Sequence, residues 1–205
     1  MFRPDFFKRQ NEIKINWQNG AAPGKIGKKL HSFLPQNPEI PVLFLCIGSD
    51  RSTGDSLGPL VGTLLMEKNL PANFHVFGTL EEPVHAMNLN DKLDFINKNF
   101  SKKFVVGIDA CLGQSKNVGT IMLKKGALKP GAGVNKSLPP VGDIHLTGIV
   151  NIGGFMEFFV LQNTRLHLVM GLAKVIAEGI YRAGMLYRLK DIPVDENMYL
   201  KEDTV

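Results

Sequence analysis

The chain has little cysteine and no long apolar run. Its two cysteines, Cys46 and Cys111, both lie among apolar residues, which indicates buried thiols rather than a disulfide framework. No charged stretch followed by an apolar one opens the chain, and no apolar run is long enough to span a bilayer. From these absences we expect a cytoplasmic protein without a membrane partner.

Common nucleotide-binding motifs are also absent. The glycine-containing stretch 47–60 has no Gly-Lys-Ser or Gly-Lys-Thr, so it is not a Walker loop, and its glycine spacing excludes the Rossmann fingerprint. An anion can bind at a helix N-terminus, but the acidic residue Asp55 in this stretch argues against a phosphate there.

The net charge of +5 is modest, and the excess of basic residues is spread over 25–29, 124–136 and the last helix. A nucleic-acid-binding surface would gather these residues into one patch or stripe. We therefore expect no nucleic-acid partner. With 205 residues, of which 44% are hydrophobic and 21% charged, the chain is expected to form a globular domain.

The middle of the chain alternates short apolar runs with helical patterns. Runs at 42–47, 74–77 and 104–108 are typical of strands, and the segments 57–69 and 88–99 place apolar residues at helical spacing. Because these runs are continuously apolar, both faces of each strand are expected to be covered. The pattern predicts an α/β fold built on a parallel sheet with crossover helices.

The second half of the chain is expected to extend the same sheet. A strand at 119–125, near an edge, and another at 143–150 are followed by a long helix at about 164–187. Between the two strands lies a long irregular stretch, 126–140, and long loops inside a compact domain are usually functional or disordered.

Three segments are predicted along the chain. Residues 1–38 are polar and read as an N-terminal arm or covering segment, with a short helix at 25–34. Residues 39–190 form the α/β domain, and residues 191–205 form a C-terminal tail.

Two aspartates follow apolar runs. Asp55 comes shortly after the first predicted strand, and Asp109 ends the run 104–108. The carboxyl ends of the strands in an open α/β sheet form the ligand crevice, so we expect both carboxylates in one crevice. Each aspartate also has a purely structural interpretation. Asp55 can cap the helix that follows, and Asp109 can be a hydrogen-bonded carboxylate at a strand end.

Two carboxylates in one crevice allow two kinds of chemistry. They can share a proton, so that one acts as a base toward water and the other as an acid. They can also hold a divalent cation, ideally with a histidine, for which His85 and His145 are the candidates. We expect no resident cofactor, and a divalent metal at the acid pair is the alternative. Cys111 lacks an obvious histidine partner for a nucleophilic role.

Several short motifs resemble known families. The segments 54–61 and 108–110 resemble two signatures of the spore germination protease and, more distantly, of the hydrogenase maturation peptidases. The loop 129–134 resembles a Pro-Gly-Ser-Gly loop of the germination protease. The segments 78–86 and 147–157 look like the YyaC-type sporulation proteins, and that resemblance extends over roughly residues 40 to 185.

The resemblance implies a three-layer α/β/α sandwich of the phosphorylase/hydrolase-like type, with a mostly parallel central sheet. It also implies a peptidase-like site in which Asp55 and Asp109 are the first and second acids. No motif places a counterpart of the histidine that completes the nickel-reading site of the hydrogenase peptidases. The substrate-binding candidates around the two acids are Gly54, Ser56, His85, Gly131, Gly133 and His145.

Within this set, backbone amides near Gly54 and Ser56 are expected to stabilise an oxyanion. The loop 124–136, which contains Gly131 and Gly133, is expected to cover the crevice or steer a peptide.

The leading hypothesis is a peptidase that hydrolyses a protein substrate in the cytoplasm of a developing spore. The alternatives are a non-catalytic binding or regulatory module on a peptidase-like fold, and a divalent-metal-dependent hydrolase. The apolar stretch 155–161 would indicate a subunit contact, and hence a homo-oligomer, if it is exposed, and it belongs to the core if it is buried.

Overall fold

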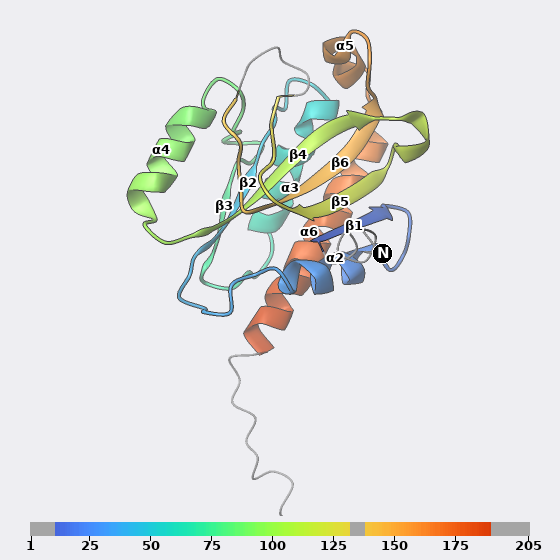
Figure 1. Cartoon of the computed structure of the whole chain (residues 1–205). Coiled ribbons are helices and arrows are strands. Elements are labelled where there is room, and N and C mark those ends of the chain that lie inside the picture. The colour runs from blue at the N-terminus through green and yellow to red at the C-terminus, as the bar shows by residue number, and fades with distance from the viewer. Residues whose placement is uncertain (1–10, 132–137, 190–205) are drawn as a thin grey trace, which may run out of the picture.

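The structure, a computed structural model, describes residues 11–131 and 138–189. These residues form one six-stranded sheet with the strand order β1-β5-β6-β4-β2-β3 (Figure 1). The strands are β1 Glu12–Asn16, β2 Val42–Cys46, β3 Phe74–Phe77, β4 Phe104–Gly113, β5 Thr120–Lys125 and β6 Ile144–Ile152. The helices are α2 Ala22–His31, α3 Leu57–Met66, α4 Leu89–Asn99, α5 Glu157–Gln162 and α6 Leu166–Leu189, with 3-10 turns η1 Gly54–Ser56 and η2 Ser115–Asn117.

The four strands β3, β2, β4 and β6 are parallel, β5 is antiparallel to β6, and β1 is antiparallel to β5. All five residues of β2 are buried, as expected for a continuously apolar strand covered on both faces. The predicted α/β fold with a mostly parallel sheet is therefore confirmed.

Helices cover both faces of the sheet. On one face, Phe44 and Val106 belong to a core cluster with the apolar residues of α2, α3 and α6. On the other face, Leu43 and Leu45 pack in a second cluster with Leu89 and other residues of α4. Figure 1 shows α4 separated from α3 and α6 by the sheet. None of the helices in the described part of the chain is long and apolar enough to cross a membrane.

Residues 11–31 contribute more to this fold than the sequence predicts. No strand was expected there, yet β1 pairs with β5 along its whole length. The predicted helix at 25–34 begins earlier, at Ala22, because Pro23 in its first turn fits a helix start. Its residues Ala22, Ile26 and Leu30 are fully buried against the core.

Strand β4 is longer than predicted. It continues beyond Asp109 to Gly113 because it keeps pairing with β6, across a bulge between Cys111 and Leu112. The prediction that Asp109 ends its strand is therefore wrong. The neighbouring strand β2, however, ends at Cys46.

Cys46 pairs with Ile108, so Asp109 is the first residue of β4 beyond the end of β2. The chain leaves β2 toward α3 on one face and reaches β4 from α4 on the other face. The carboxyl ends of β2 and β4 lie at the same edge of the sheet, where open α/β sheets form their ligand crevice. Gly133 and the predicted tail 191–205 lie outside the described residues.

Candidate active site

The loop after β2 positions Asp55. The Ile47 N–H still donates to the Ile108 carbonyl oxygen, at 2.7 Å, and the chain then turns at Gly48 with a φ of 144°. A Cβ at Gly48 would lie 1.9 Å from the Asp55 carbonyl oxygen, so the turn requires glycine. The Ser49 N–H donates to the same oxygen at 3.1 Å and closes the loop.

Asp55 therefore lies inside η1, immediately before α3. The N-cap residue of α3 is Ser56, and no side chain caps either η1 or α3. The structural interpretation of Asp55 as a helix cap is thus not what the structure shows. Its carboxyl group is left to face the crevice.

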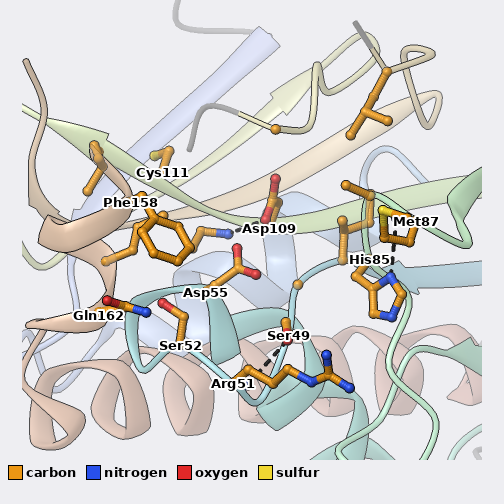
Figure 2. A pocket seen from close by; sticks show the side chains of 18 residues that line it. Ser49, Arg51, Ser52, Asp55, His85, Met87, Asp109, Cys111, Phe158 and Gln162 are labelled. Atoms are coloured by element: carbon orange, nitrogen blue, oxygen red, sulfur yellow. Dashed lines mark hydrogen bonds between the residues drawn. The ribbon is translucent and has the colours of Figure 1, made fainter. Parts of the chain in front are cut away.

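Asp109 is held by the strand itself. It is 6% exposed, and its Oδ1 accepts a hydrogen bond of 2.8 Å from the Ala110 N–H. Figure 2 shows the Asp55 and Asp109 side chains pointing toward one another, Asp55 from the loop below and Asp109 from the strand above. The structure therefore brings together the two acids that the sequence predicts.

A cavity of about 490 Å³ surrounds the two carboxyl groups. Its wall comes from the loop after β2, the end of the loop before α4, the end of β4 and helix α5 (Figure 2). The lining residues are Ile47, Gly48, Ser49, Arg51, Ser52, Asp55, His85, Ala86, Met87, Asp109, Ala110, Cys111, Leu112, Gly131, Leu138, Phe158, Leu161 and Gln162. The wall is mostly apolar apart from the acid pair and a few polar groups.

Because the two carboxyl groups are buried to different extents, Asp55 and Asp109 differ in proton affinity. Burial, and next the charge of Asp55, raises the pKa of Asp109 well above its ordinary value, against a smaller opposing effect of the Ala110 N–H. Burial also raises the pKa of Asp55, but the Ser49 N–H and the His85 ring lower it. Asp109 is therefore the group that holds a proton most firmly, and Asp55 is the one that ionises first.

His85 lies in the cavity wall at the start of the segment that leads into α4. Its backbone N–H donates to Asn88 Oδ1 at 2.8 Å, and its ring Nδ1 accepts from the Met87 N–H at 3.2 Å. In the neutral ring, a proton on Nε2 matches this contact. The ring lies beside Asp55, and a positive charge on it lowers the pKa of that carboxyl group.

Cys111 also lines the cavity, but it is not an activated nucleophile. Burial raises the pKa of its thiol to about 11, although the Thr147 hydroxyl lowers it, and the charge of Asp109 adds to the rise. A thiol with that pKa carries almost no thiolate at neutral pH.

Three of the predicted binding residues lie outside the cavity wall. A Cβ at Gly54 would lie 2.8 Å from the Leu161 Cδ2, so this glycine serves the packing of η1 on α5. The Ser56 hydroxyl is buried and donates to the Thr53 carbonyl oxygen at 2.7 Å. The Ser56 N–H donates to the Thr53 carbonyl oxygen at 3.3 Å. The expected role of backbone amides near Gly54 in stabilising an oxyanion stays a prediction.

His145 is the third of these residues. It precedes Thr147, the β6 partner of Asp109, by two residues, and its Nδ1 contacts the Gly126 carbonyl oxygen at 2.7 Å. Gly131, in contrast, lines the cavity as expected.

The sequence reasoning missed Arg51, Ser52, Phe158 and Gln162 in the cavity wall. The buried Ser52 Oγ has no hydrogen-bond partner among the described residues. Arg51 and Ser52 lie in the loop that carries Asp55, and this closeness in the sequence could have identified them. No pattern in the sequence places Phe158 or Gln162 at this cavity, because only the folded chain brings α5 to it.

Nothing in the structure tests whether a divalent metal binds at the acid pair, so that alternative stays a prediction. Among residues 11–131 and 138–189, no three His, Cys, Asp or Glu side chains gather as a metal ion would require. The two carboxyl groups are instead surrounded by apolar walls, and Asp109 is the more buried of them. Such surroundings favour a shared proton over a cation.

Comparison with known proteins finds a matching family and a close relative. Residues 14–179 match the family described as "Protein of unknown function (DUF1256)". Over 176 residues the chain is 52% identical to a protein of Bacillus subtilis (strain 168), "Uncharacterized protein YyaC", with 85% of each chain covered. This identity confirms the resemblance to the YyaC-type proteins, whereas the relation to the spore germination protease stays a prediction.

A solved structure, that of the [NiFe] hydrogenase maturation protease HycI from Thermococcus kodakarensis KOD1, is similar over 68% of this chain and 92% of that chain. The sequence identity is 15% and the TM-score is 0.37. A similarity of this size says nothing about the activity of this chain.

Proposed function

We propose that this chain, which belongs to the family described as "Protein of unknown function (DUF1256)", is a peptidase that works with two carboxyl groups, Asp55 and Asp109. The observation that carries the proposal is the meeting of these groups in one cavity, where burial and mutual charge separate their proton affinities. Such a pair holds one proton between its members, so it offers an acid and a base at once.

The first step needs a base and an acid on one carbonyl group. Asp55, as the carboxylate, takes a proton from a water molecule, and the water oxygen forms a bond to the carbonyl carbon of the scissile amide. Asp109 gives its proton to the carbonyl oxygen. The product of this step is a tetrahedral intermediate with two hydroxyl groups, and the negative charge has moved from Asp55 to Asp109.

The second step returns both groups to their starting states. Asp55 gives its new proton to the amide nitrogen, and the carbon–nitrogen bond breaks. Asp109 takes a proton from one hydroxyl group of the intermediate, which leaves a carboxylic acid and an amine as products. One water molecule is consumed for each bond cleaved.

The substrate we propose is a protein with a role in sporulation, and the site of action is the cytoplasm of the developing spore. Support comes from the motifs at 54–61 and 108–110, which resemble those of the spore germination protease. Small acid-soluble spore proteins are therefore the first substrates to test.

Cleavage of these proteins tests the function directly. Asp55→Asn and Asp109→Asn keep the size of each side chain but remove its proton chemistry. Each variant is expected to lower the cleavage rate by about 10²–10⁴-fold. The rate is measured by gel and mass spectrometry, with and without a chelator, and the wild-type rate is expected to be insensitive to the chelator.

Asp94→Asn is the matched control, because Asp94 lies on the exposed side of α4 and its loss removes the same charge. It should cleave at the wild-type rate. Normal cleavage by both site variants would disprove the acid-pair mechanism. Absence of cleavage by the wild type would instead favour the binding-module alternative.

A further inference from the structure

Among the strands of residues 11–131 and 138–189, none lies beside the edge of β4 next to the acid pair. β2 ends opposite Ile108, and no described strand pairs with β4 beyond that point on the β2 side. β4 itself continues to Gly113. Its side chains are buried from Val106 to Asp109 and only half-buried from Ala110 onward, so the strand loses its cover where its neighbour stops.

The backbone groups at this edge point away from β6. Along β4, the Phe104 N–H and the Ile108 carbonyl oxygen bond to the β2 side, whereas the carbonyl oxygens of Val105 and Gly113 accept from residues on the β6 side. Backbone groups alternate in direction along a strand, so those of Ala110 and Leu112 face the open edge. The Ala110 N–H is already used by Asp109 Oδ1.

The open edge is also the wall of the cavity. Ala110, Cys111 and Leu112 all line it, and so does Gly48 of the loop after β2. An extended residue in a sheet occupies roughly 160 Å³, from its rise along the strand, the strand spacing and the sheet spacing. A cavity of about 490 Å³ therefore has room for about three extended residues.

An aromatic side chain stands opposite this edge. Phe158 of α5 lines the cavity, yet it is 53% exposed. Large apolar side chains left open beside a cavity mark binding surfaces. The wall contains Met87, Leu112 and Leu138 as well, so apolar side chains are expected to pack against this part of it.

We infer that the β4 edge at Ala110–Leu112 is the docking surface for an extended, apolar segment of a protein substrate, which adds as a strand beside Asp55 and Asp109. The inference rests on the proposed function for one point, which is that the docked segment is cleaved. Docking needs only the unpaired backbone groups and the apolar wall. Strand addition holds the backbone of the substrate straight, which presents one amide to the acid pair.

Binding is tested apart from cleavage in the full chain carrying Asp109→Asn. The probe is the acetylated and amidated peptide Lys-Val-Leu-Val-Leu-Lys, added at up to about 1 mM, where weak peptide binding is detected. Backbone amide exchange is followed by NMR. The Leu112 N–H is expected to exchange about tenfold more slowly with peptide, whereas the Val106 N–H, which is inside the sheet, stays unchanged.

Backbone methylation separates strand addition from simple apolar adhesion. Two further peptides carry N-methyl groups on alternate residues. One is methylated at the odd-numbered positions and the other at the even-numbered positions. Only alternate residues of an added strand bond to the edge, so one peptide should bind about tenfold more weakly and the other like the parent. Equal binding by the two methylated peptides, or an unchanged Leu112 exchange rate, or no binding of any peptide, overturns the inference.

Phe158→Ala and Phe155→Ala form a matched pair. Phe155 is 85% exposed and lies outside the cavity wall, so its loss should leave the peptide affinity unchanged. Loss of Phe158 is expected to weaken binding about fivefold to tenfold.

The two proposals fail in different ways. Slow Leu112 exchange with peptide but no cleavage of any protein by the wild type would keep the docking surface and reject the peptidase. Cleavage by the wild type without any effect at Leu112 would do the reverse.

Discussion

At the scale of residues, the site shows how surroundings give two identical side chains different roles. Asp55 lies in a loop turn, where the Ser49 N–H and the ring of His85 favour its charge. Asp109 lies within a strand, is 6% exposed, and faces the other carboxyl group. The acid and the base of the proposed mechanism are therefore assigned by burial, because residue type cannot distinguish them.

The raised pKa of Asp109 makes the folded state sensitive to pH. Its folded pKa lies above the unfolded value, so the folded state prefers the protonated form. Stability from this group is complete below the unfolded pKa, near 4, and is lost as pH rises through the folded pKa. Each pH unit in that window costs the wild type about 1.4 kcal/mol.

Asp109→Asn cannot ionise and escapes this loss, while an amide oxygen can still accept the Ala110 N–H. The thermal midpoint of Asp109→Asn should therefore rise relative to that of the wild type from about pH 4 upward, and then level off. Scanning calorimetry across pH measures the difference, with Asp94→Asn as the charge control. A difference that stays constant with pH would contradict the assignment of a buried, protonated Asp109.

At the scale of elements, the site depends on close backbone contacts made by glycines. A Cβ at Gly62 of α3 would lie 1.9 Å from the Gly78 carbonyl oxygen, and one at Gly78 would lie 2.0 Å from the Cys46 carbonyl oxygen. Helix α3 thus lies directly against the chain that follows β3, next to the end of β2. This contact sets the position of α3 and of the η1 turn with Asp55 that precedes it.

Gly62→Ala is expected to destabilise the protein by about 1–3 kcal/mol or more, because the added methyl group meets backbone that cannot yield. Gly24→Ala in α2 is the matched control. Its Cβ would meet only the Arg182 Nη1, at 3.6 Å, so alanine should be neutral or stabilising by up to about 1 kcal/mol. Denaturant unfolding followed by circular dichroism measures both. Similar stabilities for the two variants would mean that α3 can move away from the sheet.

At the scale of the whole molecule, the segment with β1 and α2 packs against helix α6, which lies late in the sequence. A Cβ at Gly171 of α6 would lie 2.3 Å from the Trp17 ring, which also contacts His167 at 5.6 Å between ring centroids. A Cβ at Gly179 would lie 2.6 Å from Ile26 of α2. These close contacts place β1 and α2 in the same core as the central sheet.

Unfolding should therefore be one event for the described parts of the molecule. Trp17 is the only tryptophan in the chain, so its fluorescence reports on the packing of the N-terminal segment against α6. We expect the fluorescence and far-UV circular dichroism transitions in denaturant to coincide. Ile26→Ala should shift both together by about 2–5 kcal/mol. A Trp17 transition at lower denaturant would show instead that the N-terminal segment unfolds as a separate unit.

The sequence by itself determined the central strands and the identity of the acid pair. The continuous apolar run at 42–46 forms a strand whose five residues are all buried, since both faces need cover. The run 74–77, which contains His75, forms the edge strand β3 and is mostly half-buried. Asp55 and Asp109 follow such runs, and the carboxyl ends of parallel strands meet at one edge. No information from distant residues was needed for either step.

Only the tertiary structure decided how the site is completed. The end of β4 depends on its pairing with β6, and its open edge depends on where β2 stops. Phe158 reaches the cavity and His145 does not, although the sequence favoured the histidine, because α5 packs over η1 while the His145 ring bonds to Gly126. These are contacts between residues far apart in the chain, and a local pattern carries no information about them.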